Sequence, residues 1–123
     1  MNIALWIVQV LLAAFFAMAG FGHAIRYEQT AMAVPWVAAT PKPLVVFIGC
    51  CELLGALGVI LPWLTGRARQ LTPLAAAGLA LIMILAVPFH LMRHEAFALV
   101  FIVPVAVLAS FAAWGRARML KGT

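Results

Sequence analysis

The chain has 123 residues, of which 67% are hydrophobic and 9% are charged, and its net charge is +5 at pH 7. Soluble domains are about 45–50% apolar and about 25% charged, so this composition excludes a water-soluble globular fold and indicates a membrane domain. The Lys and Arg residues are scattered between apolar runs rather than forming a stripe. We therefore expect no nucleic-acid partner.

Four apolar runs, taken in chain order, predict four membrane-spanning helices. They cover residues 3–25, 44–64, 73–92 and 97–114, and each is close to the roughly 20 residues that cross a bilayer as a helix. Thr72 followed by Pro73 is typical of an N-cap and a first helical position, so the third helix is expected to begin there. The sequence thus predicts an all-α, four-helix transmembrane bundle in one domain spanning residues 1–123.

The loop cations predict how the bundle is oriented. With four spans, the N-terminus, the second loop and the C-terminal tail share one side of the membrane. That side carries Arg67, Arg69, Arg116, Arg118 and Lys121, and the other carries Arg26, Lys42 and Arg93. Cytoplasmic loops hold the excess of Lys and Arg, so both termini are expected in the cytoplasm, with a bacterial inner membrane as the location.

A carboxylate stands inside the second apolar run. Glu52 lies about eight residues from the outer end of this helix, or roughly 12 Å at the helical rise, which is near mid-bilayer. Gly49 and Gly55 share its face, and small residues let another helix approach closely. We therefore expect Glu52 to point into the bundle. Two interpretations remain open: a buried Glu that fixes helix packing, or a carboxylate that handles protons or binds a ligand.

Further polar residues gather at the outer ends of the first and third helices. His90 is either an interfacial side chain or the acid–base partner of Glu52. His23, Arg26 and Tyr27 are spaced to share one helical face, and Arg26 either pairs with Glu52 or an anionic ligand, or snorkels to the interface. The candidate catalytic residues are Glu52 and His90, and the candidate ligand-binding residues are His23, Arg26, Tyr27, Gly49 and Gly55.

The sequence assigns no site role to the remaining histidine, to Glu95 or to the cysteines. His94 and Glu95 lie in a short loop and are expected to be solvated. No His pair has a dedicated metal-ligand spacing, so no metal site is expected. Cys50 and Cys51 are adjacent in a helix, where a disulfide bridge is geometrically poor. The small size of the chain and an exposed glycine-rich face favour a homo-oligomer or a partner subunit.

Several stretches resemble the DoxX-like family of small four-helix membrane proteins. They are AGFGHAIR, FIGCCELLGALGVILP, LTPLAAAGLALIM, FHLMRHE and AAWGRAR, and together they cover nearly the whole chain. The resemblance assigns the family's core positions to Gly49, Glu52, Gly55 and His90. Members often carry Lys where this chain has His23, and Asn early in the fourth helix, where this chain has FIVPVAV.

The resemblance also implies a class of function, because the family name is linked to quinol oxidase and thiosulfate–quinone chemistry. The first hypothesis is an accessory subunit of a redox enzyme, or a binding protein, for a lipophilic redox molecule such as a quinone. The second is a membrane enzyme that performs acid–base chemistry on a small hydrophobic substrate with Glu52 and His90. The third is a structural or chaperone-like subunit. The sequence contains no haem, flavin or iron–sulfur motif.

Overall fold

The computed structural model describes residues 1–122, and its secondary structure is helical. The elements are α1 (Asn2–Ala24), α2 (Tyr27–Ala33), α3 (Pro35–Ala38), α4 (Lys42–Gly58), α5 (Leu61–Thr65), α6 (Leu71–Met92), the 3-10 helix η1 (Ala96–Ala98) and α7 (Leu99–Lys121). Four segments are long and apolar enough to cross a membrane: Asn2–Ala24, Lys42–Thr65, Leu71–Met92 and Ala96–Lys121. The predicted fold class, a four-helix transmembrane bundle, is confirmed.

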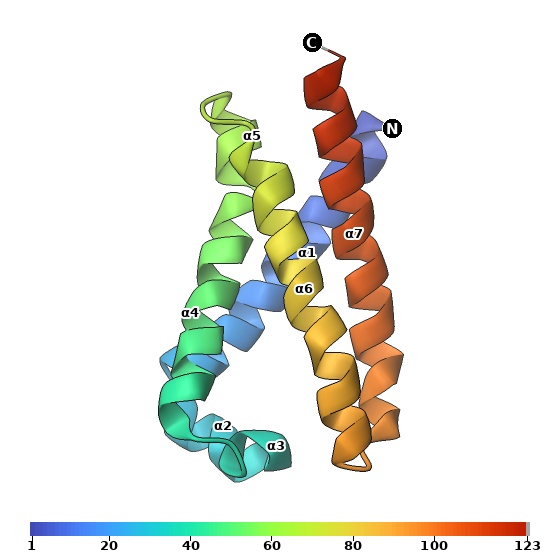
Figure 1. The fold of residues 1–123 in the computed structure, drawn as a ribbon. Coiled ribbons are helices and arrows are strands. Elements are labelled where there is room, and N and C mark those ends of the chain that lie inside the picture. The colour runs from blue at the N-terminus through green and yellow to red at the C-terminus, as the bar shows by residue number, and fades with distance from the viewer. Residues whose placement is uncertain (123) are drawn as a thin grey trace.

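The bundle is built from two helix pairs (Figure 1). Helix α1 packs mainly on α4, and α6 packs mainly on α7. Both chain ends and α5 lie at one end of the bundle, which we call the terminal end, whereas α2, α3 and the turn between α6 and α7 lie at the opposite, cap end. Helix α1 begins beside α7 at the terminal end and reaches α4 at the cap end, so it connects the two pairs.

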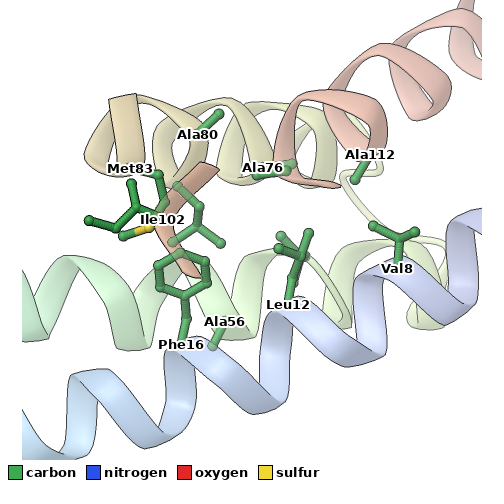
Figure 2. Close-up of a cluster of buried hydrophobic side chains, with 12 residues drawn as sticks. Val8, Leu12, Phe16, Ala56, Ala76, Ala80, Met83, Ile102 and Ala112 are labelled. Atoms are coloured by element: carbon green, nitrogen blue, oxygen red, sulfur yellow. The ribbon is translucent and has the colours of Figure 1, made fainter. Parts of the chain in front are cut away.

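An apolar core lies where the four long helices meet (Figure 2). Leu12 of α1 points towards the small side chains of Ala76 and Ala112 on α6 and α7, and Phe16 of α1 points towards Ile102 of α7. Alternating large and small residues keep the core close-packed, and packing of this kind, not the hydrophobic effect, holds helices together in lipid. Large apolar side chains such as Met18, which is 77% exposed, cover the outer surface, as is expected of a protein whose solvent is lipid.

Glycines bring α1 and α4 into backbone contact near the cap end. A Cβ atom added at Gly49 would lie 2.6 Å from the backbone nitrogen of Ala24, and one added at Gly20 would lie 2.8 Å from the carbonyl oxygen of Gly49. Gly55 is likewise buried, against Leu79 of α6. The expectation that Gly49 and Gly55 let other helices approach closely is therefore confirmed.

The helix of the second span is interrupted between α4 and α5, and side chains from other helices bond the carbonyl groups left free there. Pro62 has no N–H to donate to the carbonyl of Gly58, four residues earlier, and the hydroxyl of Thr72 donates to that carbonyl instead, over 3.0 Å. The side-chain amide of Gln9 donates to the neighbouring carbonyl of Val59. Thr72 is therefore not the predicted N-cap; α6 begins one residue earlier, at Leu71.

Candidate functional site

Glu52 is bonded to a histidine, but not to the one proposed from the sequence. Its Oε1 lies 2.6 Å from Nδ1 of His23, at the end of α1, and the carboxyl side chain is 2% exposed. Among the described residues, neither His90 nor Arg26 forms an ion pair with Glu52. Pairing with His90 or with Arg26, each of which the sequence left open beside an interfacial position, does not form, and Glu52 pairs with His23 instead.

The glycine contact explains why these two side chains meet. A Cβ atom at Gly49 would lie 2.9 Å from the Cβ of His23, so the last turn of α1 rests directly on the turn of α4 that precedes Glu52. Residues three apart share a helical face, which directs Glu52 towards the same neighbour. The prediction that Glu52 faces the bundle interior is confirmed by its burial among these helices.

His90 belongs to a second histidine–carboxylate pair at the end of α6. Its Nδ1 lies 3.2 Å from Oε1 of Glu95, and Nε of Arg93 donates to the same oxygen over 2.7 Å. The Glu95 side chain is only 13% exposed, so the expectation that it is solvated is wrong. His94 is exposed, as expected, and its positive φ of 59° lets the chain turn back so that Glu95 reaches His90.

The charge of Glu95 follows from these neighbours. The hydrogen bond from Arg93 lowers the pKa of Glu95 below its ordinary value of 4.5, and the hydrogen bond from His90 acts in the same direction. Glu95 is therefore a carboxylate at neutral pH, able to accept from both side chains. It fixes the orientation of the His90 ring as a carboxylate does in a histidine–carboxylate dyad.

Trp36, on the short cap helix α3, contacts both histidines. Its ring centroid lies 5.0 Å from that of His23 and 5.9 Å from that of His90, with a further edge contact at 5.9 Å to Phe89. Pro35 begins this helix and the buried Val37 anchors it. We call the group His23, Glu52, Trp36, His90 and Glu95 the tryptophan cluster. In this cluster, Trp36 connects the His23–Glu52 pair, on helices α1 and α4, to the His90–Glu95 pair at the end of α6.

Arg26 and Tyr27 lie elsewhere than predicted. Helix α1 ends at Ala24, and Arg26 has φ −111° and ψ 44°, outside helical geometry, so the expected common face with His23 does not form. Arg26 is exposed, and the ring of Tyr27 lies 5.3 Å from Nζ of Lys42. The structure thus brings together Glu52, His23 and Gly49, whereas Arg26 and Tyr27 belong to the surface of the cap.

The cluster combines proton exchange with an aromatic surface. In each histidine–carboxylate pair the imidazole can donate a hydrogen bond and the carboxylate can accept one, so the cluster offers both kinds of group to a bound ligand. Among residues 1–122, no group of three His, Cys, Asp or Glu side chains is placed to hold a metal ion. Trp36 is not among the residues predicted from the sequence, because its position in the outer loop is that of an ordinary membrane-interface aromatic residue.

Comparisons with known proteins agree with this architecture. A model of the DoxX-like family matches residues 7–113. No curated protein and no solved structure matches the chain. The matched range includes all of α4 and α6, parts of α1 and α7, and every residue of the tryptophan cluster. The chain is therefore a member of the DoxX-like family of membrane proteins.

Proposed function

We propose that the protein binds a lipophilic redox molecule such as a quinone, as a binding protein or as the accessory subunit of a redox enzyme. The observation that carries this proposal is the 2.6 Å contact between His23 and the buried Glu52. An ionisable pair at this depth is costly in lipid and is usually functional. A quinone has carbonyl oxygens that accept hydrogen bonds and that take up protons when the ring is reduced, and this pair supplies both a donor and a proton.

The surroundings of the pair support a flat, apolar ligand. Trp36 and Phe89 provide aromatic surface next to His23 and His90, and ligand sites are commonly apolar with a few placed polar groups. The outer faces of α4 and α6 carry exposed apolar residues such as Phe47 and Leu85. A ligand dissolved in the bilayer would reach the cluster across such surfaces.

A second candidate function is acid–base catalysis on a small hydrophobic substrate. The observation that favours it is the second pair, in which Glu95 orients a buried His90 next to the same Trp36. Catalysis of this kind would use Glu52 as one proton-transfer group and His90 as the other, with the substrate in contact with Trp36. The direct Glu52–His90 contact is not required, because the substrate would lie between them.

The test is a titration with a soluble quinone analogue in detergent, monitored by tryptophan fluorescence. Glu52→Gln keeps the side-chain shape but cannot carry a proton to or from the ligand. We expect the affinity of this variant for the quinone analogue to fall about tenfold, the effect of losing one hydrogen bond to a charged group. The matched control is Glu28→Gln, since Glu28 is exposed and bonded to Lys42 at the cap surface. Trp36→Phe should remove most of the fluorescence change.

Mass spectrometry of molecules that co-purify with the protein separates the alternatives. A quinone retained by the unmodified chain and by Glu28→Gln, but lost from Glu52→Gln, supports the proposal. Retention of a different carbonyl compound, together with its turnover, supports the catalytic alternative. Equal affinities of Glu52→Gln and Glu28→Gln, with a stability loss only in Glu52→Leu, would contradict both and leave a packing role for Glu52.

A further inference from the structure

A buried cation at the terminal end has no part in the tryptophan cluster. Arg116 of α7 is 0% exposed. Its Nε donates to the amide oxygen Oε1 of Gln9 over 2.6 Å. Its Nη1 donates to Oδ1 of Asn2 over 2.6 Å and lies 3.2 Å from Sδ of Met119. Nη2 is buried and has no hydrogen-bond partner among residues 1–122.

The side chains in contact with this guanidinium are uncharged. The ring centroid of Trp63 lies 4.3 Å from its Cζ, and that of Trp6 lies 5.2 Å away. The chain has three acidic side chains, and all lie away from this end: Glu28 in α2, Glu52 within α4 and Glu95 before η1. No acidic side chain of the chain therefore neutralises Arg116, although a buried charge without a counter-charge is costly.

The contacts of Gln9 show that this arrangement is built around the cation. Its amide nitrogen donates to the carbonyl of Val59, which fixes its oxygen towards Arg116. Gly115 allows the close approach of α7 to α1, because a Cβ atom there would lie 3.0 Å or less from the side chain of Leu5. The interior thus holds Arg116 in place through residues of α1, α7 and the interruption after α4.

A pocket lies next to the residues that surround Arg116. It has a volume of about 330 Å³ and is lined by Asn2, Trp63, Arg69, Met119 and Leu120. Three of the lining residues, Asn2, Trp63 and Met119, also contact the guanidinium of Arg116. Arg69, which lines the pocket, is a second cation. Its Cζ lies 5.2 Å from the centroid of the Trp63 ring. One tryptophan ring therefore holds two guanidinium groups.

We propose that this pocket binds the phosphate group of an anionic ligand. Arg69 lines the pocket and would donate to the phosphate oxygens, and the charge of Arg116 acts from directly behind the wall. Arg116 does not line the pocket itself, so its contribution is the attraction of its unneutralised positive charge for a bound anion. Guanidinium groups match phosphate in geometry and charge. The pocket lies where the helices end, which is the depth of lipid headgroups, and basic pockets between membrane helices bind such headgroups.

The test measures thermal stabilisation of the purified full chain in detergent by three probes. These are short-chain phosphatidylglycerol, short-chain phosphatidylcholine and inorganic phosphate. Stabilisation by phosphatidylglycerol alone identifies an anionic lipid headgroup, and stabilisation by inorganic phosphate as well identifies a site for free phosphate. Either result supports the proposal. Equal stabilisation by both lipids, or no stabilisation by any probe, overturns it.

A matched pair of variants locates the site. Arg69→Gln should weaken binding of the stabilising ligand at least about tenfold, the effect of losing a charged hydrogen bond. Arg67→Gln removes the same charge two residues away, at a position outside the pocket lining. It should change the affinity for the ligand less than about twofold. Equal losses in the two variants would show diffuse attraction to basic residues and overturn the proposal. Arg69 is exposed, so its variant is expected to fold even if Arg116→Gln does not.

Discussion

The carbonyl oxygen of Gly49 lies where a side chain at Gly20 would begin: a Cβ atom at Gly20 would be 2.8 Å from it. Real Cβ atoms essentially never come this close to another heavy atom, so α1 and α4 have their present separation only because both positions are glycine. This separation in turn allows the 2.6 Å contact between His23 and Glu52. Helix packing and the candidate site therefore depend on the same two residues.

Gly49→Ala should destabilise the protein and weaken the site together. The added methyl group would meet the backbone of Ala24, which cannot move aside as a flexible side chain can, and overpacking of this kind costs about 1–3 kcal/mol. The matched control is Gly78→Ala, because a Cβ atom at Gly78 meets nothing within 4 Å. Thermal unfolding in detergent measures the difference. A Gly49→Ala protein as stable as Gly78→Ala would show that the helix contact is looser than described.

The sequence predicts the helices well because their signal is local. A run of about 20 apolar residues is sufficient to identify a span, and the spacing of Gly49, Glu52 and Gly55 is sufficient to identify an inward face. The partner of Glu52 is not predictable in this way. It depends on where α1 ends, and that end is set by the cap, which turns Arg26 away and leaves His23 as the last basic group of the helix.

The burial of Arg116 shows the same limit. Counting cations assigns Arg116 to a side of the membrane, and a basic residue near the end of a span is expected to snorkel to the interface. Its burial results from Gln9, Trp6 and Trp63, which are distant from it in sequence and approach it only in the folded bundle. Only the tertiary structure distinguishes this arginine from its neighbour Arg118, which is exposed.

The His23–Glu52 contact should appear as coupling in a double-mutant cycle. Glu52→Leu leaves a partly buried histidine nitrogen without its partner, and His23→Leu leaves a buried carboxyl group without one. Each single substitution is expected to cost roughly 1–3 kcal/mol, the penalty of an unsatisfied buried polar group. The double variant should lose clearly less than the sum of the two. Additive losses, measured as unfolding free energies in the same detergent, would mean that the two side chains do not interact.

The Glu95 carboxylate should make stability fall at acidic pH. Arg93 and His90 lower the pKa of Glu95 in the folded chain below its ordinary value of 4.5, so its contribution is fully present above that pH. The contribution is lost as the pH falls through the lower folded pKa. Melting temperatures measured from about pH 6 to about pH 3 should therefore decline less steeply in Glu95→Gln than in the unmodified protein.

Glu28→Gln is the control for this pH series. Glu28 forms an exposed ion pair with Lys42, and exposed pairs contribute little to stability. Its acidic decline should therefore match that of the unmodified protein. If Glu95→Gln and the unmodified protein decline in parallel, the bonds from Arg93 and His90 do not stabilise the folded chain.

The distribution of cations predicts that the terminal end faces the cytoplasm. Arg67 lies in the loop after α5, at the terminal end, and Arg93 lies after α6, at the cap end. In a background with Cys50 and Cys51 replaced by alanine, Arg93→Cys should react with a membrane-impermeant thiol reagent added to intact cells. Arg67→Cys should react only after the cells are opened, because the excess of Lys and Arg is retained on the cytoplasmic side. Labelling of Arg67→Cys in intact cells would show that the protein has the opposite orientation in the membrane. It would also place the pocket beside Arg116 in the outer leaflet and the tryptophan cluster towards the cytoplasm, so the same experiment decides which leaflet supplies the ligand of each site.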